Sequence, residues 1–582
     1  MGTLYYGDNR NILEELENNG TQFDLIYLDP PFNSNANYNI LFKESTGERS
    51  VSQIMAFEDT WQWDTPAART LDDIRNDGRI SEKVKNAVDS LYKLLGDSNL
   101  MAYLVNMTYR LAQLHRILKH TGSIYLHCDP VASHYLKIIM DQIFGPENFK
   151  NEIIWRRTAY NKAEHGFGPI HQTILFYGKS KETYFKPQKG PYTKDYVESF
   201  FKGKDKRGKY QSVALTGPGV RTGDSGKPWS GYDPTKGGRH WQPASYVYDK
   251  YHALTGDDLS KYPLIDRLDK LDSVGMIDKG KEGDNVPRYK FYLKDAPGVP
   301  YQDIWAYQPG TRGSIYEDEK IGIDEDVKWI SASDKERLGY PTQKPLGLLD
   351  RIIRASCPEG GVVLDPFCGC GTTIHAAQKL GREWIGIDIT HLAINLIKRR
   401  LNDAFPGIKP KIIGEPVDPS GAKELARTNK LEFETWAISL VWAQPVETDK
   451  GRDGVIRSSE RGYGSFRGYV QVKGGENLNP GMVRDLRGTM ERDKADYGIL
   501  ITLYPPTQGM IDEALTAGFI KDVWGERIQK IQIITIDELL KDKQPRYPLP
   551  PRGFKRAERE GNEKKQDWTI TMIDDTNESN ES

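Results

Sequence analysis

Four consecutive residues, Asp29, Pro30, Pro31 and Phe32, have side chains and carbonyl groups that could bind and activate a planar amine. The amine of a heterocycle is a poor nucleophile because its lone pair is delocalised into the ring. Hydrogen bonds from its N–H groups to the Asp29 carboxylate and the Pro30 carbonyl oxygen would localise that lone pair, while the Phe32 ring stacks on the heterocycle. The prolines fix φ and lack N–H groups, so the turn is stiff and offers free carbonyls. Taken alone, these residues also fit an ordinary Pro-Pro turn.

A buried strand is expected to hold this turn in place. The apolar run Phe23–Leu28 is broken only by Asp24, which is the pattern of a strand covered on both faces of a parallel sheet. Asp29 therefore falls at the carboxyl end of a strand, and open α/β sheets bind their ligands at that edge. The local sequence thus favours a catalytic position for the turn.

A second segment has the features of a nucleoside-binding loop. The apolar run Val362–Asp365 leads into a Gly-x-Gly turn at 369–371 and then into a predicted helix at 372–380. Glycines there let the backbone approach a ligand closely, and a helix N-terminus favours a polar or anionic group. The next predicted strand, 383–389, ends near Asp388, where an acid commonly binds the ribose hydroxyls of a nucleoside.

Together these segments resemble the amino-methyltransferases of DNA, which use S-adenosylmethionine. The catalytic motif of that family, Asp/Asn/Ser-Pro-Pro-Tyr/Phe, is matched by residues 29–32, and its cofactor motif, Asp-Pro-Phe-x-Gly-x-Gly-Thr-Thr, by residues 365–373. A third motif, which lines the cofactor site, is matched by Tyr-Pro-Thr-Gln-Lys-Pro at 340–345. The catalytic motif precedes the cofactor motif, which is the order of the family's permuted β class. The resemblance covers about residues 4–405.

The resemblance implies a Rossmann-like α/β fold and transfer of a methyl group to the exocyclic amine of a base that has left the duplex of double-stranded DNA. Asp29, where the cytosine enzymes of the family more often carry Ser, favours adenine N6 over cytosine N4. For Asp8, a helix N-cap is an equally good interpretation. The implied catalytic residues are Asp29, Pro30, Pro31 and Phe32, and the implied cofactor-binding residues are Asp8, Thr342, Lys344, Asp365, Phe367, Gly369, Gly371, Thr372, Thr373 and Asp388.

A separate α/β domain is expected after a boundary rich in Pro and Gly at 405–421. The predicted order is helix (430–442), two strands (near 455 and at 469–473), helix (482–494) and strand (497–502), which resembles the Mrr-like restriction endonucleases of the PD-(D/E)xK type. The resemblance implies an Mg²⁺ site at Asp453 and Gln471, with Lys473 steadying the attacking water and Glu434 as the helical acid. Gln471 replaces an acid, as in some Mrr-like members, so a nuclease-like fold kept for DNA binding is the alternative.

Composition shifts, together with the two family resemblances, imply five parts of the chain. Between 180 and 300, residues 201–209 form a basic stretch, and basic and aromatic residues interleave at 239–241 and 287–290, as a groove for phosphates and bases requires, although solvated loops explain any one cluster as well. The five parts are a catalytic half of the methyltransferase (1–179), a target-recognition region (180–300), a cofactor-binding half (301–405), an Mrr-like domain (422–548) and a disordered tail (549–582).

Composition also limits the class of protein. With 582 residues and 37% hydrophobic residues, two to four globular domains are expected. No run approaches about 18 apolar residues and the first residues lack a signal-peptide pattern, so neither a membrane span nor secretion is expected. The four cysteines lack disulfide or zinc spacing, which fits a reduced cytoplasm, and His127 with its two neighbours is better explained as a polar strand end than as a metal site. A net charge of −2 means that DNA binding must rely on local basic patches.

Three functions remain compatible with the sequence. The first is a DNA methyltransferase fused to an active nuclease, and the second is the same methyltransferase with a C-terminal module that only binds DNA. The third is methylation of a protein amide or an RNA base, because a Pro-Pro-aromatic site suits any planar amine. The basic insertion and the nuclease-like domain favour DNA. The recognition sequence, the effect of methylation on cleavage and the oligomeric state stay open, with a homodimer among the alternatives.

Overall fold

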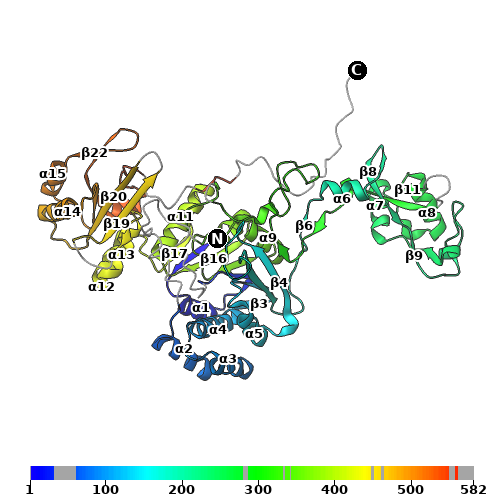
Figure 1. Cartoon of the computed structure of the whole chain (residues 1–582), viewed down its shortest axis with the longest axis horizontal. Helices are drawn as coiled ribbons and strands as arrows, with labels where there is room; N and C mark the ends of the chain where they lie inside the picture. The colour runs from blue at the N-terminus through cyan, green and yellow to red at the C-terminus, as the bar shows by residue number, and fades with distance from the viewer. Residues whose placement is uncertain are drawn as a thin grey trace, which may run out of the picture. The chain divides into compact units, whose positions relative to one another are not determined.

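The fold is described from a computed structural model, in which the described residues are 2–31, 61–279, 286–331, 334–340, 342–446, 451–460, 464–549 and 557–560 (Figure 1). These residues divide into two compact units. Unit 1 contains the described residues of 2–188, 302–307 and 324–560, and unit 2 contains those of 189–301 and 308–323. Each unit is built around its own buried apolar residues, and they are taken in turn.

The larger sheet of unit 1 has nine strands among the described residues, in the order β14-β4-β5-β3-β2-β15-β16-β1-β17. All neighbours are parallel except that β5 is antiparallel to both β3 and β4. Strand β2, the predicted run before the turn, lies directly beside β15, the predicted run before the Gly-x-Gly loop. The strands are β1 (Thr3–Tyr6), β2 (Phe23–Leu28), β3 (Leu118–Cys128), β4 (Phe149–Arg156), β5 (His171–Gly178), β14 (Ile304–Trp305), β15 (Val362–Asp365), β16 (Glu383–Asp388) and β17 (Lys411–Ile413).

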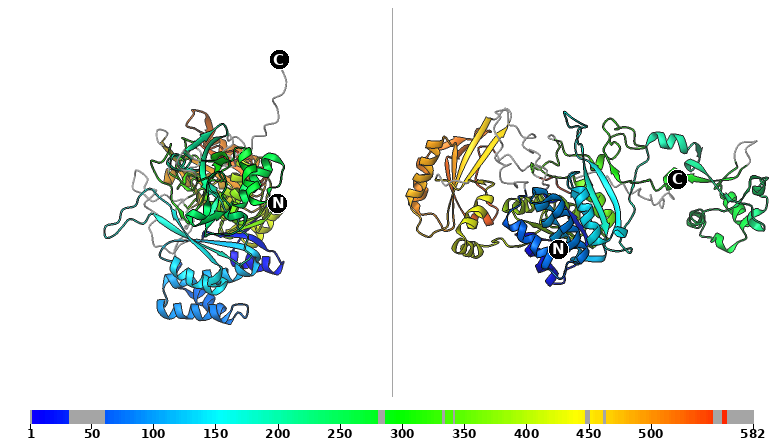
Figure 2. Two further views of the ribbon diagram at one scale, coloured as in Figure 1. Left: turned by 90° about the vertical axis from the view of Figure 1, so that its right-hand side faces the viewer. Right: turned by 60° about the horizontal axis from the view of Figure 1, so that its bottom comes forward.

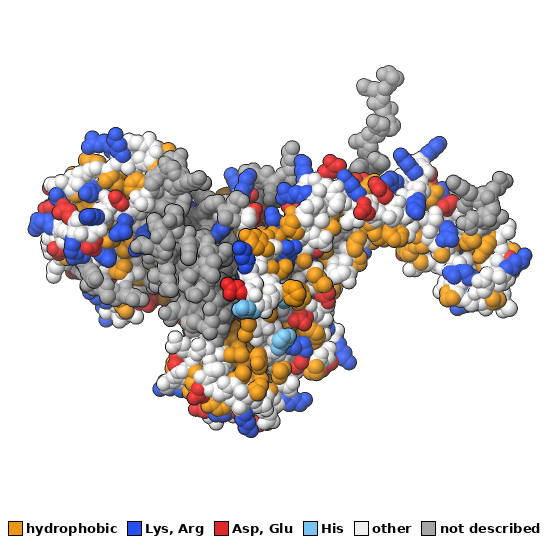
Figure 3. Space-filling view, viewed as in Figure 1, with side chains coloured by type: hydrophobic (Ala, Val, Ile, Leu, Met, Phe, Trp, Pro, Cys, Tyr) orange, Lys and Arg blue, Asp and Glu red, His pale blue; other side chains and the backbone are white. Residues whose placement is uncertain are grey.

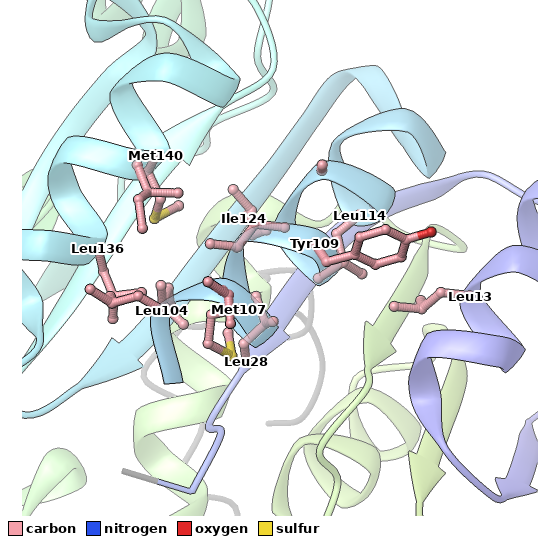
Figure 4. Packing of buried hydrophobic residues seen from close by; sticks show 14 of the residues in the cluster. Leu13, Leu28, Leu104, Met107, Tyr109, Leu114, Ile124, Leu136 and Met140 are labelled. Atoms are coloured by element: carbon pink, nitrogen blue, oxygen red, sulfur yellow. The ribbon is translucent and has the colours of Figure 1, made fainter. Parts of the chain in front are cut away.

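Helices cover both faces of this sheet, which explains why its central strands are apolar throughout. Ile26 and Leu28 pack with the helices of one face, a cluster seen from close by in Figure 4, whereas Leu25 and Tyr27 pack with those of the other. In Figures 1 and 2 the helices of residues 65–144 gather on one face of the sheet. The first face carries α1 (Asn9–Asn18), α4 (Asn99–Ile117) and α5 (Ser133–Phe144), with α2 (Thr65–Asn76) and α3 (Glu82–Leu95) packed on them, and the second carries α9 (Leu346–Ser356), α10 (Thr372–Lys379) and α11 (His391–Ala404).

Asp24, the single charged residue of β2, has a structural role. Its Oδ2 accepts hydrogen bonds from Lys119 Nζ at 2.7 Å and from the backbone N–H of Val362 at 2.8 Å. A buried carboxylate needs such partners, and here they tie the beginning of β2 to the beginning of β15. The acid in the apolar run therefore strengthens the junction between the two strands whose opposite ends form the candidate site.

The C-terminal part of unit 1 is a second sheet of five strands, in the order β18-β19-β20-β21-β24. The predicted helix, strand, strand, helix and strand are all confirmed, but the predicted boundary at 405–421 already contains β17 and the first turn of a helix. One cluster of apolar residues lies under α12, α13 and α16, and another under α14 and α15. The elements are α12 (Pro419–Thr428), α13 (Lys430–Ser439), β18 (Gln444–Pro445), β19 (Gly454–Glu460), β20 (Gly464–Lys473), α14 (Pro480–Asp493), β21 (Tyr497–Thr502), α15 (Gln508–Thr516), β22 (Phe519–Lys521), β23 (Arg527–Gln529), β24 (Ile531–Thr535) and α16 (Ile536–Leu540).

Unit 2 has a core of its own, which the sequence did not lead us to expect because its apolar residues lack a regular period. Trp229, Trp241 and Tyr289 are buried in that core together with apolar side chains of two helices. Aromatic side chains bury a large apolar area each, so a few of them suffice for a small domain. The elements are β6 (Lys189–Gly190), α6 (Lys194–Phe200), β7 (Gly203–Asp205), β8 (Gly208–Ala214), β9 (Thr216–Pro218), β10 (Arg239–Trp241), α7 (Ser245–Thr255), α8 (Leu264–Ser273), β11 (Ile277–Asp278), β12 (Arg288–Tyr292) and β13 (Val299–Pro300).

Two further expectations concern membrane-spanning helices and the C-terminal tail. Within the part of the chain that the structure describes, no helix is both long enough and apolar enough to cross a membrane. Most of 549–582, the expected disordered tail, lies outside the described residues. Residues 557–560 are described, however, and contact the nine-stranded half of unit 1, which differs from that expectation.

Candidate functional site

Three acids lie at the carboxyl edge of the nine-stranded sheet. Asp29 directly follows β2, Asp365 ends the neighbouring strand β15, and Asp388 ends the next strand, β16. Because β2, β15 and β16 are parallel, the predicted amine-binding turn and residues 365–373, here called the cofactor loop, begin at the same edge. The structure thus brings together the two motifs that are more than 300 residues apart in the sequence.

Asp29 forms an ion pair with Lys344, whose ammonium group contacts its Oδ2. Both side chains are largely buried, 15% and 9% exposed. Burial raises the pKa of Asp29, and the positive charge of Lys344 opposes that rise. Lys344, which we predicted as a cofactor-binding residue, is therefore placed on the acid of the amine-binding turn.

Side chains from other parts of unit 1 lie at or next to the amine-binding turn. The Pro31 carbonyl oxygen accepts a hydrogen bond from Trp61 Nε1 at 3.2 Å. Next to the turn, Tyr27 OH lies 2.9 Å from Nδ1 of His127, whose Nε2 lies 2.9 Å from Gln172 Oε1. Phe32, predicted to stack on the base, lies outside the described residues.

His127 belongs to this hydrogen-bond network. Burial holds the pKa of His127 well below its usual value, so the ring is neutral at neutral pH. A neutral ring has one donor and one acceptor, and it donates from Nε2 to Gln172 while Nδ1 accepts from Tyr27. No group of three or more His, Cys, Asp or Glu side chains suited to a metal ion occurs among the described residues. The interpretation of 127–129 as a polar strand end fits these contacts.

The cofactor loop has the backbone conformation for which glycine is needed. Gly369 and Gly371 have φ values of +47° and +74°, which side chains other than glycine rarely adopt. A Cβ atom on Gly371 would lie 2.7 Å from Ile397 Cγ1 of α11. Thr372 and Thr373 then begin α10, so the N–H groups at the start of a helix lie at the sheet edge, where they suit a polar or anionic group.

Asp365 and Asp388 hold this loop against the strand ends. Asp365 Oδ1 accepts from the N–H of Phe367 at 3.1 Å. Asp388 accepts from the N–H of Gly369 at 2.9 Å and from Thr390 Oγ1 at 2.8 Å. Burial raises the pKa of Asp365 to about 7 and that of Asp388 to about 6. Buried carboxylic groups beside a glycine loop are a setting suited to a ligand that carries hydroxyls or a positive charge.

These two acids predict that the ligand-free protein loses stability as pH rises. Between the unfolded pKa of about 3.9 and the folded pKa, the folded state keeps protons that the unfolded state has lost. The free energy of unfolding should therefore fall from about pH 4 to about pH 7 and then level off. Asp365→Asn should reduce this slope in urea titrations at several pH values, and an unchanged slope would contradict the assignment to Asp365.

Asp8 and Thr342 lie at the margins of the site. Asp8 caps α1 by accepting from the N–H of Arg10 at 2.9 Å, which confirms the N-cap interpretation, and it also pairs with Arg110 at 3.0 Å. The backbone N–H of the preceding residue, Gly7, donates to the Asp388 carbonyl oxygen at 3.0 Å, so Asp8 follows a residue that is hydrogen-bonded to the end of β16. Thr342 is exposed, in the segment that leads to Lys344.

The predicted nuclease residues form a second, separate candidate site. Asp453 precedes β19, Gln471 and Lys473 lie on β20, and Glu434 lies on α13. Burial and the Asp453 carboxylate raise the pKa of Glu434, while Lys430 and Lys473 oppose that rise, so these charges lie within reach of one another. The structure therefore brings the predicted acids and Lys473 together.

Gln471 is the residue in this site whose environment is unusual. It is 7% exposed, and its Oε1 is buried without a hydrogen-bond partner, while its Nε2 donates to the Gly451 carbonyl oxygen at 3.4 Å. A buried acceptor without a partner costs free energy, and a cation would satisfy it. Mg²⁺ prefers oxygen ligands, so the Gln471 amide and the two carboxylates fit that ion.

The basic and aromatic clusters of unit 2 are largely used for its own packing. Trp241 is buried in the core, Arg239 donates to Thr216, and Lys290 pairs with Asp205 at 2.9 Å. By contrast, three lysines in or directly before the β7–β8 hairpin are exposed: Lys202, Lys204 and Lys206. On the face shown in Figure 3, the described Lys and Arg side chains are mixed with Asp and Glu, in keeping with the net charge of −2.

Comparison with known proteins gives a family to which this arrangement belongs. The model of a family described as DNA methylase matches residues 23–399, which is well over half of the chain. The chain belongs to this DNA methylase family. A second model, described as restriction endonuclease, matches residues 425–541. The methylase match contains Asp29, Lys344 and the whole cofactor loop but begins after Asp8, and the endonuclease match contains all four predicted nuclease residues.

Individual relatives of this chain include two curated enzymes. The Type II methyltransferase M.EcaI of Enterobacter cloacae is 33% identical over 51% of this chain and 57% of its own length. The StyLTI Mod subunit of a Type III restriction-modification enzyme of Salmonella typhimurium is 27% identical over 65% of this chain and 50% of its own length. The chain thus spans about half the length of these curated relatives. A solved M1.HpyAVI–SAM complex aligns over 69% of this chain and 100% of its own at 14% identity, and its TM-score of 0.30 is too low to carry an argument.

Proposed function

We propose that this DNA methylase transfers a methyl group from S-adenosylmethionine to the exocyclic amine of a base in a specific DNA sequence. The preferred acceptor is N6 of adenine. The observation that carries the proposal is that Asp29 and the cofactor loop begin at the carboxyl ends of adjacent parallel strands. We also propose that the chain belongs to the permuted β class, in which the catalytic motif precedes the cofactor motif. Asp29 in place of the Ser of cytosine enzymes supports adenine.

The residues of the turn would prepare the amine. The Asp29 carboxylate and the Pro30 carbonyl would accept its two N–H groups, and Lys344 fixes the carboxylate through Oδ2. Bound S-adenosylmethionine supplies a methyl group on a sulfonium. Transfer of the methyl group from sulfur to the amine nitrogen would release one proton, which the Asp29 carboxylate or water would accept. The glycines of the cofactor loop and the buried acids at the strand ends fit this cofactor.

Isotopic transfer identifies the substrate and the base. The full chain would be incubated with S-adenosylmethionine labelled in its methyl group and with duplex DNA, RNA or protein extract, and digested DNA would be analysed for its methylated nucleosides. Label in N6-methyladenine supports the proposal, whereas label only in N4-methylcytosine overturns the choice of base. Label confined to RNA or protein overturns DNA as the substrate.

The target base is expected to leave the stack, because the turn cannot reach an amine inside a duplex. A base that is already mispaired or lies opposite an abasic position has lost part of its pairing energy. Affinity for such a site should therefore exceed affinity for the fully paired site several-fold, measured by fluorescence anisotropy at one salt concentration. Equal affinities would count against flipping.

Unit 2 is proposed to contact the target DNA through its lysine hairpin. Lys202, Lys204 and Lys206 are exposed within a few residues of one another, so they can neutralise successive phosphates. Replacing all three with alanine should weaken DNA binding and lower the slope of log K against log salt by about one per lysine. Lys261→Ala, which removes an exposed lysine elsewhere in unit 2, is the matched control. An unchanged slope in the triple variant would exclude the hairpin.

The five-stranded domain is proposed to hydrolyse DNA. Asp453 and Gln471 would hold Mg²⁺ with Glu434 as the helical acid beside them; the ion would polarise the phosphate and make a bound water more acidic, and Lys473 would orient that water. Attack by water oxygen on phosphorus breaks one phosphodiester bond and releases a proton. A domain that only binds DNA stays the alternative, because Gln471 removes one acid from the ligand set.

A further inference from the structure

A buried arginine of α11 supports the cofactor loop. Arg400 is 3% exposed, and its Nη1 donates to the Cys370 carbonyl oxygen at 3.1 Å and to Thr372 Oγ1 at 3.0 Å. A guanidinium carries several donors in a fixed plane, so it fixes the relative positions of the groups that it binds. Arg400 thus holds both the Gly-x-Gly turn and the first residue of α10.

The same network continues to the amine-binding turn. Thr372 Oγ1 donates to the Lys344 carbonyl oxygen at 3.3 Å, and the ammonium group of Lys344 pairs with Asp29. A displacement of Thr372 would therefore be felt at Lys344 through one hydrogen bond. The cofactor loop and the turn share this support although they come from different halves of the sheet.

Arg400 is held in turn by His375 of α10. Arg400 Nε donates to His375 Nδ1 at 3.1 Å, and His375 Nε2 lies 2.7 Å from Glu560 Oε1. Burial lowers the pKa of His375 to about 4, although Glu560 opposes the shift, so the ring is neutral at neutral pH. Since Nδ1 accepts from the guanidinium, the single ring proton is on Nε2 and is donated to the Glu560 carboxylate.

Glu560 belongs to a short segment, Ala557 to Glu560, that follows the five-stranded domain. Its backbone N–H donates to the Ala404 carbonyl oxygen at 3.0 Å, at the end of α11, and its carboxylate lies 3.6 Å from Lys379 Nζ. Ala557 packs against a cluster that includes Tyr340 and Cys370. The segment therefore contacts α10 and α11 and packs against the cluster to which Cys370 of the cofactor loop belongs.

We propose that Arg400 and His375 are positioning residues for the cofactor loop and that Glu560 completes their network, so that full affinity for S-adenosylmethionine requires the segment after the nuclease-like domain. The network links the loop, two helices and this segment through consecutive hydrogen bonds. The inference rests on the S-adenosylmethionine-dependent function proposed above. None of the three side chains needs to touch the reacting atoms.

Calorimetric titration of the full chain with S-adenosylmethionine, without DNA, tests the inference. Glu560→Ala removes the acceptor of the His375 proton and should raise Kd about three- to tenfold. Glu560→Gln retains an acceptor oxygen and should stay within about twofold of the wild type. Glu558→Ala, which removes an exposed acid of the same segment, should leave Kd unchanged. Arg400→Lys keeps the charge without the planar donors and should raise Kd about tenfold or more.

The outcomes separate the inference from the function on which it rests. Methyl transfer by Glu560→Ala should show a raised KM for S-adenosylmethionine with an unchanged kcat, as expected for a residue that positions the loop only. Unchanged Kd in Glu560→Ala, or equal weakening in Glu560→Gln or Glu558→Ala, would overturn the inference while the function stands. A wild-type chain that binds no S-adenosylmethionine would overturn the proposed function instead.

Discussion

Asp29→Ala is expected to abolish methyl transfer, with a fall in kcat of at least about 10²-fold, while S-adenosylmethionine still binds. The variant removes the carboxylate that would accept the amine proton and leaves the glycine loop intact on the neighbouring strand. Rates of label transfer to duplex DNA and calorimetric titration of the cofactor measure the two effects separately. Loss of cofactor binding together with activity would mean that the variant damages the site more widely.

The ion pair with Lys344 complicates this variant, and matched substitutions resolve it. Removing one partner of a largely buried ion pair destabilises a protein by about 3–5 kcal/mol. Asp29→Ala combined with Lys344→Met removes both charges, so it should recover stability but not activity. Asp72→Ala, which removes an exposed acid of α2, should leave both unchanged. Full activity in Asp29→Ala would exclude the turn as the site of chemistry.

Lys473→Ala is expected to eliminate Mg²⁺-dependent cleavage of DNA and to leave methyl transfer unchanged. Lys473 lies on β20 beside Gln471, and its charge acts on Glu434, so it is placed to orient a water at the predicted metal. The proposed methyl-transfer site is built on a different sheet, and sites without shared partners respond nearly independently to substitution. Cleavage would be followed on unmethylated and methylated DNA that contains the recognition sequence, with and without Mg²⁺.

Gln471→Glu and Lys521→Ala make this test decisive. The first substitution places an acid where the PD-(D/E)xK pattern has one, so it should lower the Mg²⁺ concentration needed for half-maximal cleavage. The second removes an exposed lysine on β22 of the same domain and should change nothing. If the wild type and Gln471→Glu both bind DNA without Mg²⁺ and produce no strand breaks, the domain only binds DNA.

The nine-stranded sheet was predictable where local sequence dictates structure. The run Phe23–Leu28 is a strand with the predicted bounds, because a buried parallel strand needs consecutive apolar residues and the two prolines end it. Gly369 and Gly371 likewise have the left-handed conformations for which glycine is selected. The motifs also predicted that two distant segments meet, since both had to lie at a carboxyl edge.

Contacts without a local pattern could not be predicted. Arg400 lies in a helix whose sequence shows only an apolar period, and its partners are 25 to 30 positions away. Glu560 is a charged residue in a polar stretch, and its composition favours disorder although its carboxylate binds His375. In unit 2 the alternation of basic and aromatic residues suggested a groove for DNA, whereas Trp241 and Tyr289 form its core. Composition describes which groups are present, but long-range packing decides which of them face solvent.

The pairing of β2 with β15 also sets an order of events on the ribosome. Val362 is made more than about 300 positions after Leu28, which at roughly 5–20 residues per second takes between a quarter of a minute and a minute. During that interval the growing chain has β2 without one of its neighbours, and a strand edge without its partner is prone to aggregation. We therefore expect that chaperones that prevent aggregation matter more during synthesis of this protein than after it has folded. Because β17 precedes β18, all strands of the nine-stranded sheet are synthesised before the first strand of the five-stranded sheet.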